Sequence, residues 1–123
     1  MSDERLICTG TPASPGVVTG KVVFSIDDTL KHRSHGDRIV LVKTETTPED
    51  LLAIMNSDAV VTSLGGVTSH TAVMAREFRK PCVVGCGELR INGKRGYFRA
   101  GRAVVKRFQS IKIDGNTGRI LLV

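Results

Sequence analysis

The residues best suited to chemistry in this sequence surround one histidine, His70. Two glycines, Gly65 and Gly66, come first, and the small hydroxylated residues Thr68 and Ser69 follow. Glycine lets the backbone make a tight or left-handed turn and lets a bulky group approach closely. The residues after the histidine are mostly helix formers, so the pattern predicts a loop that leads into a helix with His70 in its first turn.

No acidic residue occupies the start of this predicted helix. The first amide groups of a helix lack intrahelical partners and carry the positive end of the helix dipole, so an anion is stabilised there. The first acidic residue is Glu77, about two turns into the helix. The other predicted helix, residues 48–56, follows the capping residue Thr47 and has acidic residues in its first turn. We therefore expect the amides of residues 68–72 to face the oxygens of a phosphate carried on His70.

A neutral imidazole in this position is a candidate nucleophile toward phosphorus. The residues alone leave open a second interpretation, in which His70 is a capping or core histidine without a chemical role.

The length and composition of the chain predict one globular domain over residues 1–123, with a core of Val, Ile and Leu because the sequence has no Trp and one Tyr. No apolar run approaches the length of a membrane span, so we expect no membrane partner. The first five residues lack the apolar core of a signal peptide, and we expect a cytoplasmic protein.

Charge is divided unevenly along the chain. Residues 1–74 carry six Lys and Arg against nine Asp and Glu, whereas residues 75–123 carry twelve against three. A basic half attracts phosphate-bearing ligands, acidic protein surfaces or nucleic acid. We do not expect nucleic acid, because there are few aromatic residues to stack on bases and no recognised nucleic-acid motif.

Two groups of residues suggest a metal site at first sight. Cys82 and Cys86 flank a predicted strand that separates their sulfurs by roughly 13 Å, too far for one ion. With Cys8 they form an odd set that predicts buried free thiols. His32 and His35 lie in a polar stretch without an evident third ligand, so we interpret them as part of a solvated loop and expect no metal ligand in the chain.

The hydrophobic pattern predicts an α/β fold. Strands and helices alternate in a β-α-β-α-β order that favours a parallel sheet, with strands expected at residues 17–24, 38–43, 58–62 and 81–85. Residues 11–16 contain two prolines and predict a rigid turn. Residues 110–122 predict a β-hairpin, which we expect to form a second sheet with the N-terminal strand. A glycine loop after a strand of such a sheet is where ligands bind.

One stretch of the chain resembles the active-site signature of the phosphoenolpyruvate (PEP)-utilising enzyme mobile domain, a swivelling phosphohistidine domain: Gly65-Gly66-x-Thr68-Ser69-His70-x-Ala72-x-x-Ala75-Arg76-x-x-x-x-Pro81-x-Val83-Val84-Gly85. Residues 12–16, 41–50 and 113–118 are also similar to family positions, most like those of pyruvate phosphate dikinase and phosphoenolpyruvate synthase. One departure is Phe108-Gln109, where the family usually has Gly-Asp.

The resemblance implies a three-layer β/β/α domain with a mostly parallel central sheet and a C-terminal hairpin. It implies that His70 accepts a phosphoryl group from one partner site and passes it to another. Thr47 matches a family threonine near the histidine, and we expect its hydroxyl to orient the imidazole, with a plain N-cap role as the alternative. The residues expected to bind phosphate or orient the site are Gly65, Gly66, Thr68, Ser69, Thr71 and Thr47. Arg76 points away from the histidine on a helix, which favours a structural role.

The resemblance further implies that turnover needs domains that this sequence does not contain. The expected partners are an ATP-grasp-type nucleotide-binding protein and a phosphoenolpyruvate- or pyruvate-binding barrel protein, with Mg²⁺ on those partners and no cofactor on this chain. The leading hypothesis is a phosphohistidine carrier, either free-standing or a separate subunit. The alternatives are a non-catalytic regulatory or docking module, and one domain of a longer enzyme.

Overall fold

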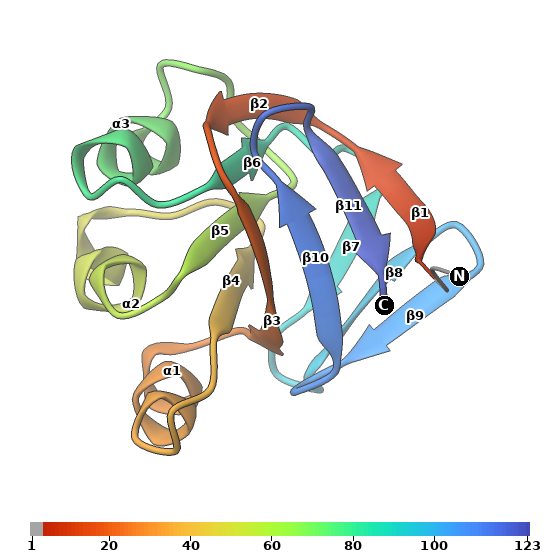
Figure 1. The fold of residues 1–123 in the computed structure, drawn as a ribbon, viewed down its shortest axis with the longest axis horizontal. Coiled ribbons are helices and arrows are strands. Elements are labelled where there is room, and N and C mark those ends of the chain that lie inside the picture. Colours follow the sequence, from red (N-terminus) through yellow and green to blue (C-terminus); the bar gives the residue numbers. More distant parts are fainter. Residues whose placement is uncertain (1–3) are drawn as a thin grey trace.

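The fold is a mixed α/β arrangement in which one large sheet is covered on both faces (Figure 1). The computed structural model describes residues 4–123, so the first three residues of the stretch examined for a signal peptide lie outside it. The first half of the chain contains β1 (Arg5–Thr9), β2 (Thr11–Ser14), β3 (Val17–Val23), α1 (Ile26–Arg33), β4 (Ile39–Lys43), the 3-10 helix η1 (Pro48–Asp50), α2 (Leu51–Met55) and β5 (Ala59–Thr62). The second half contains α3 (His70–Glu77), β6 (Cys82–Val84), β7 (Leu89–Asn92), β8 (Tyr97–Ala100), β9 (Ala103–Lys106), β10 (Ser110–Asp114) and β11 (Arg119–Leu122).

The large sheet is parallel at its centre and antiparallel at its flanks. Its order is β1-β11-β10-β3-β4-β5-β6-β2, and the pairings from β3 through β6 are parallel. The central strands β4 and β5 are buried on both faces, which explains their continuous apolar sequences. Every pairing outside this centre is antiparallel, so the sheet as a whole is mixed rather than mostly parallel.

Two hydrophobic clusters lie on opposite faces of this sheet. One contains side chains of α2 and α3 packed on the sheet, such as Ile54 and Ala72, and the other contains side chains of β8 and β9, such as Phe98 and Val105. Figure 1 shows the helices together on one side and β7, β8 and β9 on the other. No helix in the described part of the chain is both long enough and apolar enough to span a membrane.

The C-terminal hairpin is present, but its expected place in a second sheet was wrong. Ile113 pairs with Ile120 within the hairpin, and it also pairs with Val18 of β3. Because β3 itself pairs with β4, the hairpin extends the large sheet. The second sheet is instead formed by β7, β8 and β9.

The rigid turn expected at residues 11–16 is in fact mostly strand. Residues 11–14 form β2, an edge strand that pairs antiparallel with β6. Proline has no amide to donate to a sheet, and it is tolerated at an edge, where one side of the strand has no neighbour. Pro12 therefore fits this position, and the turn is confined to Pro15 and Gly16, whose φ is +121°.

Candidate functional site

His70 is the first residue of α3, as the sequence predicted, and it is half-buried. Ser69 is the N-cap, with extended backbone angles, and its side-chain oxygen accepts a hydrogen bond from the amide of Ala72 at 3.3 Å. This capping interaction fixes the point at which the helix begins. It also means that the Ser69 hydroxyl already has a structural role beside the histidine.

The glycine loop before His70 needs glycine at only one of its two positions. Gly65 has a φ of +97°, and a Cβ atom there would lie 2.9 Å from the Cβ atom of Ser69. Both observations exclude an ordinary side chain without a shift of the loop. Gly66 has no such constraint, because a Cβ atom there would meet open space.

The imidazole of His70 contacts a buried pair of threonine hydroxyls. The Oγ1 atom of Thr46 lies 3.1 Å from Nδ1 of His70 and also hydrogen-bonds to Oγ1 of Thr71. Thr46 and Thr71 are 6% and 2% exposed, so water does not compete for these hydrogen bonds. Within residues 4–123 the other ring nitrogen, Nε2, has no hydrogen-bond partner. The contact therefore holds one edge of the ring and leaves the other free.

The expectation that Thr47 orients the imidazole was wrong by one residue, because Thr46 makes the contact. Thr47 is exposed and is the N-cap of η1, where its amide donates to Oδ2 of Asp50 at 2.9 Å. Side chains of successive residues in an extended backbone point to opposite sides. Thr46 thus faces the histidine and Thr47 faces away, which agrees with the alternative N-cap interpretation.

Arg76 ties the His70 loop to the edge of the sheet. Its guanidinium donates through Nη2 to the carbonyl oxygen of Val67 at 2.6 Å and through Nη1 to that of Ala13, in β2, at 3.1 Å. These bonds connect the loop before His70 to a strand that is 63 residues away from the arginine in sequence. Arg76 therefore has the structural role that the sequence favoured, with carbonyl groups as its partners.

The backbone amides near His70 are only partly free to bind an anion. The amide of Ser69 donates to Gly66, and the amide of Ala72 donates to the Ser69 side chain. The amides of Thr68, His70 and Thr71 make no hydrogen bond within the described residues. Three of the five amides that the sequence singled out are thus available at the positive end of α3.

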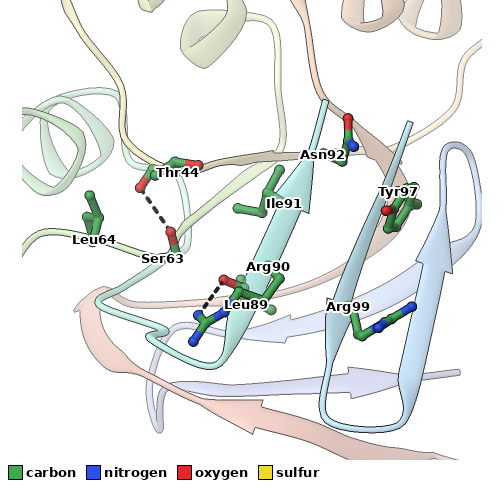
Figure 2. A pocket seen from close by; sticks show the side chains of 9 residues that line it. All are labelled: Thr44, Ser63, Leu64, Leu89, Arg90, Ile91, Asn92, Tyr97 and Arg99. Atoms are coloured by element: carbon green, nitrogen blue, oxygen red, sulfur yellow. Dashed lines mark hydrogen bonds between the residues drawn. The ribbon is translucent and has the colours of Figure 1, made fainter. Parts of the chain in front are cut away.

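A separate pocket of about 490 Å³ lies between the second sheet and the ends of β4 and β5 (Figure 2). Its walls include Thr44 and Ser63, which follow those strands, and Arg90 and Arg99, which lie opposite each other on β7 and β8. None of residues 65–71 lines this pocket. The hollow is therefore a second feature of the molecule and does not enclose the imidazole.

The three cysteines Cys8, Cys82 and Cys86 are buried and free, which confirms the expectation from the sequence. Burial raises the pKa of Cys82 to about 12, so this residue is a neutral thiol at physiological pH. A neutral thiol is a poor nucleophile, and Cys82 contributes to the core beneath α3.

The domain has a mixed α/β fold and carries a histidine at the start of a helix. A buried pair of threonine hydroxyls holds this histidine, so that one edge of the imidazole stays free. The family model of the PEP-utilising enzyme mobile domain matches residues 35–118. The chain belongs to this family, which confirms the resemblance seen in the motif around His70.

The chain is also similar to individual proteins, among them pyruvate, phosphate dikinases. The chain is 39% identical over 119 residues to the chloroplastic pyruvate, phosphate dikinase of Flaveria trinervia and 38% identical over 116 residues to pyruvate, phosphate dikinase of Rhizobium meliloti (strain 1021). These alignments cover 97% and 94% of this chain but only 12% and 13% of the relatives. A solution structure of Enzyme I is 29% identical, with a TM-score of 0.46 over 68% of this chain and 29% of that one. The chain thus corresponds to one part of much longer dikinase relatives.

Proposed function

We propose that the chain is a phosphoryl carrier, in which His70 accepts a phosphoryl group from one partner and transfers it to another. The single observation that carries the proposal is the contact between Thr46 and Nδ1 of His70, which leaves Nε2 without a partner in the described residues. A reactive imidazole usually attacks through one ring nitrogen while a hydrogen bond to the other nitrogen activates and orients the ring.

The hydrogen bond between Thr46 and His70 has two possible senses. If Nδ1–H donates to Thr46, the Nε2 atom keeps its lone pair and is a nucleophile. If the threonine hydroxyl donates instead, the ring proton lies on Nε2 and the free edge cannot attack. We assign the first sense to the reactive state, with the Thr46 hydroxyl donating in turn to Oγ1 of Thr71.

The proposed step forms one bond and breaks one bond. The Nε2 lone pair attacks the phosphorus of the donor, the bond from phosphorus to its leaving oxygen breaks, and the leaving group departs with the electron pair. The proton on Nδ1 stays in its hydrogen bond to Thr46, so the phosphorylated imidazole ring carries a positive charge. Attack by an acceptor oxygen on the same phosphorus then returns the electron pair to Nε2.

The loop and the helix start would stabilise the transferred group. The amides of Thr68, His70 and Thr71 lie at the positive end of α3, and Gly65 and Gly66 leave room for a phosphate to approach. Thr68 is exposed, so its hydroxyl is also accessible to the phosphate or to a modifying enzyme.

The donor and acceptor sites would lie on partners. We propose a nucleotide-binding protein or domain of the ATP-grasp type and a phosphoenolpyruvate- or pyruvate-binding barrel, with Mg²⁺ held by them, as parts of a dikinase- or synthase-like system. The similarity to pyruvate, phosphate dikinases supports this branch, and the greater length of those relatives supports the need for partners. We further propose that the layered fold is the swivelling β/β/α type and that the chain works in the cytoplasm.

Exposed apolar side chains around His70 support docking of such partners. Leu64 and Val67 precede the histidine and are 52% and 50% exposed, and Val73, one turn after it, is 42% exposed. Apolar side chains that cluster around a reactive group are typical of surfaces that are covered during function. A covered site also excludes water, which would otherwise hydrolyse the phosphohistidine.

A labelling experiment tests the proposal. The chain is incubated with each candidate partner and with phosphoenolpyruvate or ATP that carries a labelled transferable phosphate. We expect base-stable, acid-labile label on the chain, and we expect His70→Gln to remove it while Thr47→Val retains it. Absence of label with every partner would contradict the proposal. Partner binding that survives His70→Gln without any labelling would instead support the docking-module alternative.

A further inference from the structure

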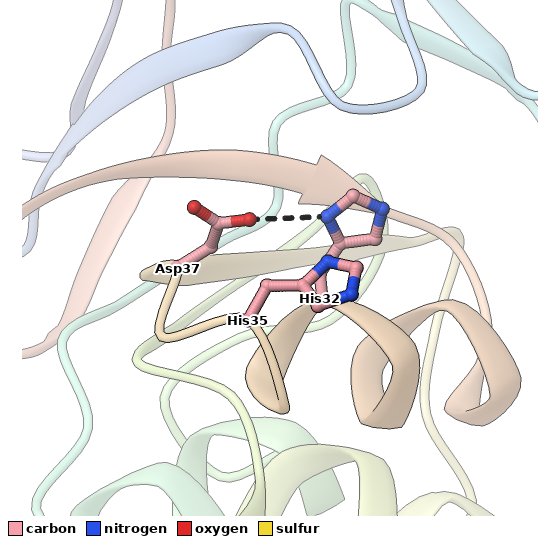
Figure 3. Close-up of side chains that lie close together, drawn as sticks. All are labelled: His32, His35 and Asp37. Carbon is pink, nitrogen blue, oxygen red and sulfur yellow. Dashed lines mark hydrogen bonds and ion pairs between the residues drawn. The ribbon is translucent and has the colours of Figure 1, made fainter.

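Three side chains with metal-binding atoms come together where α1 ends (Figure 3). One ligand atom each from His32, His35 and Asp37 lies within 4.8 Å of the other two. From the sequence, only His32 and His35 were considered as metal ligands. The structure adds the carboxylate of Asp37 as a third group. The cluster lies at the end of α1, whereas His70 begins α3, and these two helices lie at opposite ends of the helical face (Figure 1).

The backbone of the turn holds these groups on one side. The amide of His35 donates to the carbonyl oxygen of His32 at 3.1 Å, and the amide of Gly36 donates to that of Arg33 at 3.0 Å. Gly36 has a φ of +80°, a conformation that glycine adopts without strain. This left-handed residue reverses the chain and brings Asp37 back toward His32.

The ring of His32 is already fixed in place. Its Nδ1 atom lies 3.2 Å from Oδ2 of Asp37, and its face packs against Phe108 with ring centroids 3.7 Å apart. Only 13% of the side chain is exposed. Phe108 has a φ of +71°, a backbone conformation that glycine adopts more readily. The phenylalanine thus supplies a wall for the histidine that a glycine would not provide.

We propose that His32, His35 and Asp37 form a site for a divalent transition-metal ion of the Zn²⁺ type. Two imidazole nitrogens and a carboxylate oxygen are ligands that Zn²⁺ prefers, and water would complete a tetrahedral shell. Ligand atoms in such a shell are roughly 3.3 Å apart, given metal–ligand bonds of about 2.0 Å. Because His35 is exposed, its side chain is free to close the remaining gap.

The metal ion would replace the ammonium group of Lys21, which forms an ion pair with the carboxylate of Asp37. The Nζ atom of Lys21 lies 3.3 Å from Oδ2 of Asp37, the same oxygen that faces His32. The lysine side chain is 39% exposed, so it can move into solvent when a metal binds. Lys21 therefore competes with the ion, and its removal strengthens metal binding.

Titration of the full chain with Co²⁺ and Zn²⁺ tests this site. We expect one equivalent of Co²⁺ to bind, with visible d–d absorption and without thiolate charge-transfer absorption, and Zn²⁺ to displace it. Binding of Zn²⁺ to the folded chain also raises the melting temperature. Charge-transfer absorption would point to the cysteines and would contradict the proposal, as would the absence of any binding at submillimolar metal.

Matched variants locate the ion. We expect His35→Ala and Asp37→Asn each to weaken binding roughly tenfold or more, and Lys21→Gln to strengthen it. His35 is exposed, so its removal leaves the fold intact, which circular dichroism and the metal-free melting temperature check. His70→Gln serves as the control histidine and leaves the affinity unchanged. Equal affinity in His35→Ala and the unmodified chain, or loss of binding in His70→Gln alone, would overturn the assignment.

Discussion

The hydroxyl oxygen of Thr46 lies 3.1 Å from Nδ1 of His70, although 24 residues separate the two in sequence. The threonine reaches the histidine because β4 and β5 are parallel neighbours, so the loops after them meet at one edge of the sheet. The Thr46 hydroxyl also bonds to Thr71, one residue after the histidine. The buried hydroxyl of Thr46 thus joins the loop after β4 to the start of α3.

Thr46→Val should change the tautomer of His70. Valine keeps the shape of threonine but has no hydroxyl, so Nδ1 loses its partner and the preference for a proton on Nδ1 disappears. Nitrogen-15 NMR of the imidazole reports the tautomer without any partner protein. We expect an Nδ1–H signature in the unmodified chain, a shift toward Nε2–H in Thr46→Val, and no shift in Thr47→Val. An Nε2–H ring in the unmodified chain would contradict our assignment of the reactive state.

Asp50 should stabilise the turn that carries Thr46 in a pH-dependent way. Burial raises the pKa of Asp50, but hydrogen bonds from the Lys43 ammonium at 2.7 Å and from the Thr47 amide at 2.9 Å outweigh it and lower the pKa overall. A lowered pKa adds stability above the unfolded-state value, which is near 4, and this stability is lost as the pH falls through the folded-state pKa.

Asp50→Asn should therefore lower the free energy of unfolding by about 1 kcal/mol at pH 7 and by progressively less below pH 4. Urea titrations at several pH values measure this difference. Glu49→Gln is the matched control, because Glu49 is the exposed neighbouring carboxylate. A loss in Asp50→Asn that does not depend on pH would show that the charge is not the cause.

Much of the fold was predictable because burial on both faces leaves a continuous apolar pattern. The strands at β4, β5 and β6 and the start of α3 lie where the sequence placed them. Other features depend on which elements become neighbours, and sequence patterns carry no such information. The strand β2 forms around a proline only because it lies at an edge of the sheet.

The candidate site shows the same limit at the level of single residues. His70 and Gly65 were identified from local patterns, since a helix start and a positive φ are local properties. The choice between Thr46 and Thr47 depends on which of two successive side chains faces a helix that lies 24 residues further on. Asp37 was missed for a related reason, because the turn at Gly36 brings it back toward His32.

Arg90 and Arg99 should destabilise the second sheet through their like charges. They are directly opposite each other on β7 and β8, both are exposed, and residues 89–107 include no Asp or Glu. Like charges in opposed positions cost up to about 1 kcal/mol, and salt screens the cost. We expect Arg99→Thr to raise the melting temperature at low ionic strength and to lose this advantage in 1 M NaCl.

A double-mutant cycle with Arg90→Thr separates this repulsion from other effects of the substitutions. The Nη1 atom of Arg90 also donates to the carbonyl oxygen of Gly87 at 2.7 Å, so the single variants need not be equal. The coupling energy should nevertheless be unfavourable for the arginine pair and should decrease with salt. A coupling energy of zero at low salt would show that the two guanidinium groups avoid each other.

Gly65→Ala should disturb the start of α3 more than Gly66→Ala does. At Gly65 the backbone has a φ of +97°, and an added Cβ atom would lie 2.9 Å from the Cβ atom and 3.1 Å from the Oγ atom of Ser69. The loop can relieve this contact only by moving Ser69, whose side chain caps the helix that begins at His70. We expect a loss of about 2 kcal/mol in the free energy of unfolding, from backbone strain together with a weaker cap.

Gly66→Ala is the matched control, because a Cβ atom there meets open space, and it should cost less than about 0.5 kcal/mol. Urea unfolding of both variants measures the two costs. Amide hydrogen exchange at Ala72, whose N–H donates to Ser69, reports the cap directly and should accelerate only in Gly65→Ala. If both variants unfold alike and protect Ala72 equally, the left-handed backbone at Gly65 does not hold the helix start in place.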